Sequence, residues 1–144
     1  MFNSVLVICT GNICRSPIAE RLLRKLIPAK QIDSAGIAAL VNHEADTAAI
    51  AVAQEHSVSL AGHKGTQFKS SLGQKYDLIL VMEKSHIEFI SGISPEARGK
   101  VFLLGHWLGQ KEIPDPYRKS HEAFEYVYQL IEQACLRWVE KLNG

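Results

Sequence analysis

Residues 5–17, VLVICTGNICRSP, decide the fold of this chain. The stretch begins with apolar, mostly β-branched residues that end at Cys9, which predicts a buried strand. Gly11 and Asn12 tolerate positive φ, so they predict a turn. Ser16 then predicts a helix N-cap, with Pro17 at the first helical position. A cysteine therefore ends a strand just before an arginine opens a helix.

This strand–turn–helix arrangement is suited to binding an oxyanion. A loop that folds onto a helix N-terminus directs several backbone N–H groups at one point, where the helix dipole adds positive charge. Arg15 would supply a planar guanidinium that matches two phosphate oxygens. Cys9 would lie in the same field, which favours its thiolate. We therefore predict Cys9 as the nucleophile of a phosphoryl transfer and Arg15 as its phosphate ligand.

Two motifs together resemble those of the low-molecular-weight protein tyrosine phosphatases. Residues 9–17 match the signature of that family, and its second mark, Asp-Pro-Tyr, stands at residues 115–117. Cys-x5-Arg alone is common by chance, so the whole string carries the resemblance, which runs from about residue 4 to residue 142. Residues 76–80 and 112–120 resemble the bacterial branch associated with capsule and exopolysaccharide export.

Composition narrows the class of protein. A length of 144 residues predicts one domain, residues 1–144. The formal net charge of +1 gives no basic field for a nucleic-acid partner. Three cysteines are an odd count that favours a reducing compartment. Because the chain shows no signal-peptide pattern and no apolar run of ~20 residues, we expect a cytoplasmic protein with no membrane insertion.

Apolar strands alternate with helical patterns along the chain. The predicted strands are 5–9, 31–35, 76–82 and 101–104, and the predicted helices are 17–27, 47–56, 83–93 and a last helix with an apolar stripe through 124–142, with a helical turn near 70–73. Such alternation indicates a parallel sheet with helices on both faces. The resemblance implies a single-domain, flavodoxin-like α/β sandwich with strand order 2-1-3-4. The site is then expected beyond the carboxyl end of the first strand.

Asp115 is the predicted general acid. The resemblance gives it this role through the Asp-Pro-Tyr motif, and the chemistry requires a proton for the leaving tyrosyl oxygen. Asp before Pro is also a common turn signal, so the assignment depends on its pairing with the Cys9 loop. As a carboxylate, Asp115 would then activate water against a cysteinyl-phosphate.

The other residues of the loop are predicted to bind substrate. This set is Thr10, Gly11, Asn12, Ile13, Cys14 and Ser16. Ile13 and Tyr117 would hold a flat phenyl ring at the mouth of the pocket, and Leu40 would add another apolar wall. A deep pocket favours phosphotyrosine over phosphoserine. Related phosphatases that act on phosphoarginine have threonine at the position of Ile13, so this residue favours tyrosine.

Several residues are predicted to support the loop. Ser16 would donate a hydrogen bond to the Cys9 thiolate, and Asn12 would brace the loop with its side chain. The resemblance implies that Ser34 and His63 hold this asparagine, although ordinary loop roles remain open for both.

The other two cysteines have different predicted roles. The resemblance implies a reversible disulfide between Cys14 and Cys9, which would shield the nucleophile from irreversible oxidation. A small buried loop residue is an equally open interpretation of Cys14. Cys135 lies on the apolar stripe of the last helix and is predicted to be core.

Two positions depart from the pattern of the wider family. Thr66 stands where many members have Arg, and Glu83 stands where many have Asp. We assign neither a chemical role, and we expect both to affect only loop packing.

Three alternative functions share features with this sequence. An arsenate reductase shares the fold but needs a further cysteine pair after the third strand, and residues 82–99 contain no cysteine. A phosphotyrosine-binding module without turnover would be expected to have lost Cys9 or Asp115. A redox switch formed by Cys9 and Cys14 is compatible with phosphatase activity.

The expected partners follow from the resemblance. It implies a phosphotyrosine protein substrate, namely a membrane-bound bacterial tyrosine autokinase with a tyrosine-rich tail. The histidines show no metal-binding spacing, and no Walker or dinucleotide motif is present, so we expect no metal and no cofactor. We also expect a monomer.

Overall fold

The strand β1 (Ser4–Cys9) lies inside a parallel sheet and is buried along its whole length. In the computed structural model, which describes residues 2–143, it pairs with β2 (Gln31–Gly36) on one side and β3 (Leu78–Val81) on the other. The strand β4 (Val101–Leu103) pairs with β3, so the order is β2-β1-β3-β4. The predicted parallel α/β sheet and its strand order are confirmed.

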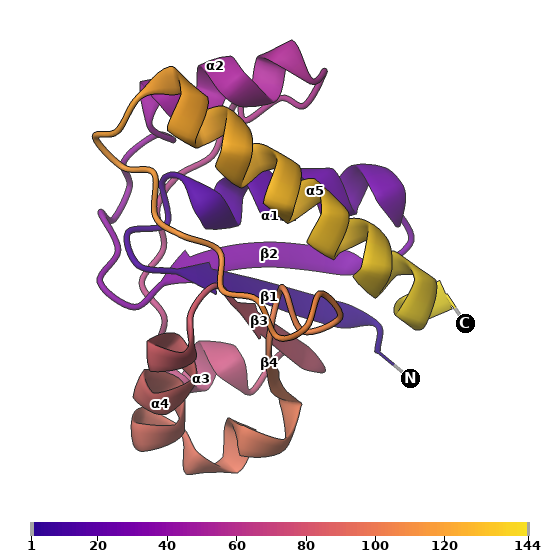
Figure 1. Ribbon diagram of the computed structural model, residues 1–144. Coiled ribbons are helices and arrows are strands. Elements are labelled where there is room, and N and C mark those ends of the chain that lie inside the picture. The colour runs from indigo at the N-terminus through magenta and orange to yellow at the C-terminus, as the bar shows by residue number, and fades with distance from the viewer. Residues whose placement is uncertain (1, 144) are drawn as a thin grey trace.

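Helices cover both faces of this sheet, as Figure 1 shows. The helices α1 (Arg15–Leu26), α2 (Thr47–Glu55) and α5 (His121–Asn143) lie on one face, and α3 (Ser70–Gly73) and α4 (Lys84–Ile93) lie on the other. A 3-10 helix, Pro95–Lys100, joins α4 to β4. No helix among residues 2–143 is long and apolar enough to cross a bilayer.

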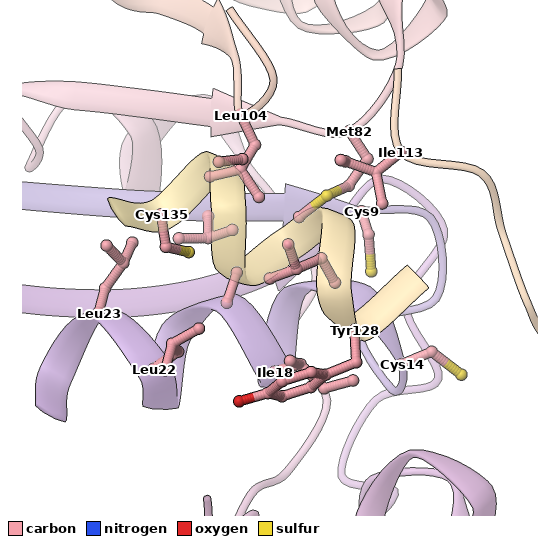
Figure 2. Close-up of a cluster of buried hydrophobic side chains, with 14 of the residues drawn as sticks. Cys9, Cys14, Ile18, Leu22, Leu23, Met82, Leu104, Ile113, Tyr128 and Cys135 are labelled. Atoms are coloured by element: carbon pink, nitrogen blue, oxygen red, sulfur yellow. The ribbon is translucent and has the colours of Figure 1, made fainter. Parts of the chain in front are cut away.

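The side chains of β1 divide between two hydrophobic cores because successive residues of a strand point to opposite faces. Val5, Val7 and Cys9 join the core beneath α1 and α5, and Leu6 and Ile8 join the core on the α4 face. Figure 2 shows the first core, in which α5 packs over α1. The nucleophile candidate thus stands at the edge of a packed interior, which fixes its position.

Cys135 lies within the core between α5 and the sheet, as the apolar stripe predicted (Figure 2). It is completely buried, and burial raises the pKa of its thiol. A protonated thiol in such surroundings behaves as a small apolar side chain.

The start of α1 differs from the prediction. The helix begins at Arg15 with Cys14 as its N-cap residue and no side-chain cap, so the assignment of Ser16 as N-cap is wrong. The Ser16 hydroxyl instead contacts Cys9 and Asn12. Pro17 still lies within the first turn, where its missing N–H costs no helical hydrogen bond.

The starts of one helix and one strand can also be compared with the sequence. Asp46 caps α2 as predicted, with its carboxylate accepting the N–H of Ala48 at 3.0 Å. The strand β3 begins at Leu78, later than predicted. Tyr76 and Asp77 are occupied elsewhere, since the Tyr76 hydroxyl donates to Asp33 and the Asp77 N–H donates to Ser4.

Gly36, the last residue of β2, has no room for a side chain. A Cβ there would lie 2.5 Å from the carbonyl oxygen of Thr10 and 3.0 Å from the backbone nitrogen of Asn12. We predict that Gly36→Ala lowers the free energy of unfolding by about 1–3 kcal/mol, because backbone must shift to admit it. Gly92→Ala in α4 has open space and is expected to be neutral or stabilising by up to about 1 kcal/mol. Urea unfolding measures both, and equal stabilities would refute the close approach.

Candidate active site

A cavity of about 160 Å³ opens beyond the carboxyl end of β1. It is lined by Cys9, Thr10, Gly11, Ile13, Cys14, Arg15, Leu40, Asp115 and Tyr117. A larger cavity of about 530 Å³ lies beside α2, but among the described residues no cysteine or arginine lines it. The smaller cavity is therefore the one equipped for phosphoryl transfer, at the edge where parallel sheets place their sites.

The Cys9 sulfur is almost completely buried and has a hydroxyl partner. Its Sγ lies 2.9 Å from the Oγ of Ser16. The Nδ2 of Asn12 donates to the same Oγ at 2.7 Å. Because this serine oxygen already accepts from the amide, its O–H is free to donate to sulfur. That donation stabilises a thiolate more than a thiol.

Asn12 holds the turn of the loop in the left-handed region, with a φ of 58°. Its Nδ2 also donates to the Oγ of Ser34 at 3.0 Å, and its Oδ1 accepts the backbone N–H of Thr66 at 2.9 Å. The Nε2 of His63 donates to its carbonyl oxygen at 2.6 Å. Ser34 and His63 thus both contact Asn12, but the histidine reaches the backbone and not the side chain.

The side chains of Asn12 and Ser16 lie behind the loop. Both are fully buried, and neither lines the cavity. Their side chains therefore lie on the inner side of the loop, where a supporting role was predicted for both, and their predicted contact with substrate stays a prediction. The network continues inward, because the Ser34 hydroxyl donates to the buried carboxylate of Glu20 at 2.7 Å. Glu20 was not predicted from the sequence.

Arg15 is held in place by groups from three other segments. Its side chain is 1% exposed, and one terminal nitrogen donates to the carboxylate of Glu83 at 2.6 Å and to the carbonyl of Ile113 at 2.7 Å. The other, Nη2, donates to the Oγ1 of Thr10 at 3.3 Å. Such fixed donors need little reorganisation when an oxyanion binds.

The contact between Glu83 and Arg15 corrects the sequence interpretation. Glu83 was expected to affect only loop packing, yet its carboxylate anchors the guanidinium of the site. The signal was available, since Glu83 follows β3 and the carboxyl ends of parallel strands meet at one edge of the sheet. Thr66 also enters the site region, but through its backbone N–H alone.

Glu83→Gln is predicted to lower kcat/KM roughly tenfold or more, because a hydrogen bond to a charged group contributes about 1.5–3 kcal/mol. The uncharged amide partner would leave the guanidinium less firmly oriented. Glu88→Gln, an exposed change on the same helix, is the matched control. Steady-state kinetics with a phosphotyrosine peptide measure both, and identical values for the two variants would remove Glu83 from the site.

Asp115 stands at the rim of the cavity with its side chain 45% exposed. Its Oδ1 accepts the backbone N–H of Tyr117 at 3.0 Å, and its Oδ2 lies 3.7 Å from the Nη2 of Arg15. One oxygen thus faces the guanidinium from the open side of the cavity. This is where the leaving group of a bound phosphate ester would emerge.

Three apolar side chains surround the same opening. Ile13 is nearly buried in the wall, whereas Leu40 and Tyr117 are 40% and 38% exposed. An aromatic ring entering between them would lose apolar surface to water. The geometry therefore suits a planar substrate group above the phosphate position.

Cys14 lines the cavity as a free thiol, and so does Cys9. Burial, followed by the charges of Asp46 and Cys9, raises the pKa of the Cys14 thiol. Of the two, Cys9 alone has a hydroxyl donor to support a thiolate.

Within residues 2–143, no cluster of three or more His, Cys, Asp or Glu side chains is arranged to hold a metal ion.

Known proteins resemble this chain over its full length. Residues 4–144 match the family model described as low molecular weight phosphotyrosine protein phosphatase. The low molecular weight protein-tyrosine-phosphatase Etp of Escherichia coli K12 is 56% identical over 142 residues, which cover 99% of this chain and 96% of Etp.

Solved structures agree with these sequence matches. The tyrosine phosphatase Wzb of Escherichia coli K30, crystallised with sulphate, superposes with a TM-score of 0.97 at 66% identity, covering 99% of each chain. Wzb of Vibrio vulnificus, crystallised with benzylphosphonate, gives a TM-score of 0.96 at 54% identity over 98% of this chain and 99% of that one. These relatives confirm the predicted bacterial branch, the one associated with capsule and exopolysaccharide export. The chain belongs to the low molecular weight phosphotyrosine protein phosphatase family and is a protein-tyrosine phosphatase.

Proposed function

We propose that this phosphatase hydrolyses phosphotyrosine through a phosphoryl group carried on Cys9, and that its substrate is a membrane-bound tyrosine autokinase of polysaccharide export. The observation that carries the chemistry is the convergence of Cys9, Arg15 and Asp115 on one cavity, with a hydroxyl 2.9 Å from the sulfur. Nucleophile, anion ligand and acid then meet at one phosphorus atom.

In the first step, the Cys9 thiolate attacks phosphorus from the floor of the cavity. The S–P bond forms as the P–O bond to the tyrosyl oxygen breaks, and Asp115 gives its proton to that oxygen. Arg15 and the backbone N–H groups of the loop hold the equatorial oxygens, whose charge shifts during transfer. The products are free tyrosine in the protein substrate and a cysteinyl-phosphate.

In the second step, water attacks the same phosphorus. The Asp115 carboxylate takes a proton from that water as the new P–O bond forms and the S–P bond breaks. The electron pair returns to the Cys9 sulfur, where the Ser16 hydroxyl donates a hydrogen bond to the thiolate. Inorganic phosphate then leaves, and Asp115 is protonated for the next cycle.

The rim residues support tyrosine as the phosphorylated side chain. The Vibrio relative binds benzylphosphonate, which carries a phenyl ring one carbon from phosphorus. In this chain, a ring at that distance from the loop would lie among Ile13, Leu40 and Tyr117. A phosphoserine side chain has no ring to fill this space.

The test is hydrolysis of matched phosphotyrosine, phosphoserine and phosphoarginine peptides with chelator and reductant present. We expect phosphate release from the phosphotyrosine peptide alone, at a rate unchanged by the chelator. Preferential release from the phosphoarginine peptide would refute the substrate class. Loss of activity on adding chelator would refute the metal-free mechanism.

Two observations support an autokinase as the substrate. The relatives belong to the capsule and exopolysaccharide branch, and the rim of the cavity is apolar and exposed, so that the extended tail of an autokinase would reach it. The purified phosphatase should remove phosphate from the tail of an autokinase from the same cell. A substrate found only among proteins unrelated to export would overturn this assignment. We also propose that the enzyme acts as a cytoplasmic monomer, which cell fractionation and light scattering test.

A further inference from the structure

His86 is a buried histidine beside the cavity that the two chemical steps leave unused. It stands on the first turn of α4 and is 1% exposed. One ring nitrogen faces the Glu83 backbone, and the other faces the hydroxyl of Thr10 in the loop after β1. The imidazole thus joins the loop after β1 to the N-terminus of α4.

The hydrogen-bond partners assign its tautomer. The backbone N–H of Glu83 is only a donor, and it lies 3.2 Å from the Nδ1 of His86, so Nδ1 accepts and carries no proton. In a neutral ring, Nε2 is then the protonated nitrogen. It lies 3.1 Å from the Oγ1 of Thr10 and therefore donates to it.

Burial keeps this ring neutral. It lowers the pKa of His86, and the guanidinium of Arg15 acts in the same direction, while the carboxylates of Glu83, Glu112 and Asp115 oppose both. The outcome is a lowered pKa. The Nδ1 acceptor therefore persists at neutral pH.

The Thr10 hydroxyl is left with one way to bond. An sp³ hydroxyl oxygen has two lone pairs and one hydrogen. Its oxygen accepts from the Nε2 of His86 at 3.1 Å and from the Nη2 of Arg15 at 3.3 Å. Because both lone pairs are engaged, the hydroxyl can form a further hydrogen bond only by donating its hydrogen. Thr10 is one of the residues that line the cavity, and its Oγ1 lies beside the Nη2 of Arg15, the predicted phosphate ligand.

We propose that the Thr10 hydroxyl is a substrate ligand that donates to a phosphoryl oxygen, and that His86 is a positioning residue that directs this donor. The proposal rests on the proposed function, because it adds a side-chain donor to the same phosphate site. The backbone N–H groups of the loop are then joined by an O–H whose direction is set by α4. A side chain of α4, on one face of the sheet, thereby orients a hydroxyl of the loop that leads into α1, on the other face.

Four variants test this unit. Thr10→Val removes the hydroxyl but keeps the branched shape, and Thr10→Ser keeps the hydroxyl. His86→Phe keeps a ring without a donor, and His86→Gln restores an N–H. Each is compared with the parent for kcat and KM on a phosphotyrosine peptide, for binding of inorganic phosphate and for thermal unfolding.

Thr10→Val should lower kcat roughly tenfold or more, since a hydrogen bond to a charged group is worth about that factor or more. Thr10→Ser should keep most of the activity. His86→Phe should lower kcat in the parent but cause little further loss in Thr10→Val, because the two residues act through one hydrogen bond. His86→Gln should recover part of that loss. Nitrogen NMR of the parent should show a neutral ring protonated at Nε2.

Parental kcat in Thr10→Val would overturn the proposal, and so would independent, multiplying losses in the double variant or a ring protonated at Nδ1. An inactive parent would instead refute the proposed function. In that case, inorganic phosphate decides the inference without turnover: weaker binding by Thr10→Val than by Thr10→Ser supports it, and equal binding overturns it.

Discussion

Replacing Cys9 with serine is expected to abolish turnover while the protein stays folded and still binds inorganic phosphate. Serine keeps the size of the side chain and its place at the end of β1, but its hydroxyl is a far weaker nucleophile than a thiolate and a poorer leaving group in the second step. The phosphate ligands of the loop and Arg15 are unchanged. The effect is therefore on kcat and not on the affinity for an oxyanion.

Steady-state kinetics and phosphate titration separate these two effects. Cys135→Ser is the matched control, because this buried thiol lies in the core away from the cavity. It should lower the melting temperature, since it buries a hydroxyl in an apolar core. The value of kcat per folded molecule should stay near that of the parent. Substantial turnover by Cys9→Ser would refute the covalent mechanism.

Asp115→Asn is expected to lower kcat on phosphotyrosine by about 10²–10⁴-fold, the usual contribution of a positioned general acid. Asparagine keeps the acceptor oxygen that meets the Tyr117 N–H but has no acidic proton for the leaving tyrosyl oxygen. The loss should be much smaller for an aryl phosphate whose phenol is strongly acidic, because that leaving group needs no proton.

The comparison of the two substrates serves as the internal control. A change that merely distorted the rim would lower both rates together. Equal losses on phosphotyrosine and on the activated ester would therefore remove Asp115 from the acid role. The carboxylate also lies 3.7 Å from Arg15, so a parallel measurement of phosphate binding shows whether loss of its charge alters that site.

The sheet was predictable because its strands are continuous apolar runs of the kind that parallel sheets bury. Both ends of β1 and the cap of α2 at Asp46 follow from local residue chemistry. The N-cap assignment of Ser16 failed for a physical reason. A serine before a proline is a good cap in isolation, but here a sulfur and an amide from the loop compete for its hydroxyl.

The contacts across the sheet edge were the least predictable part of the site. The Cys9–Arg15 loop and the 115–117 motif each carry their own sequence signal. Glu83 has only its place after β3 as a signal and His86 has none, because nothing local pairs them with Arg15 and Thr10, which are distant in the sequence. Their roles appear only once β1 and β3 are neighbours in the sheet.

Rapid chemical quenching tests whether the phosphoryl group passes through Cys9. The enzyme is mixed with an excess of phosphotyrosine peptide, quenched within one turnover and digested, and its peptides are examined by mass spectrometry. The mechanism predicts a phosphoryl group on the peptide that contains Cys9, appearing with the first tyrosine released and before free phosphate. Simultaneous release of tyrosine and phosphate, with an unmodified Cys9 peptide at every quench time, would contradict it.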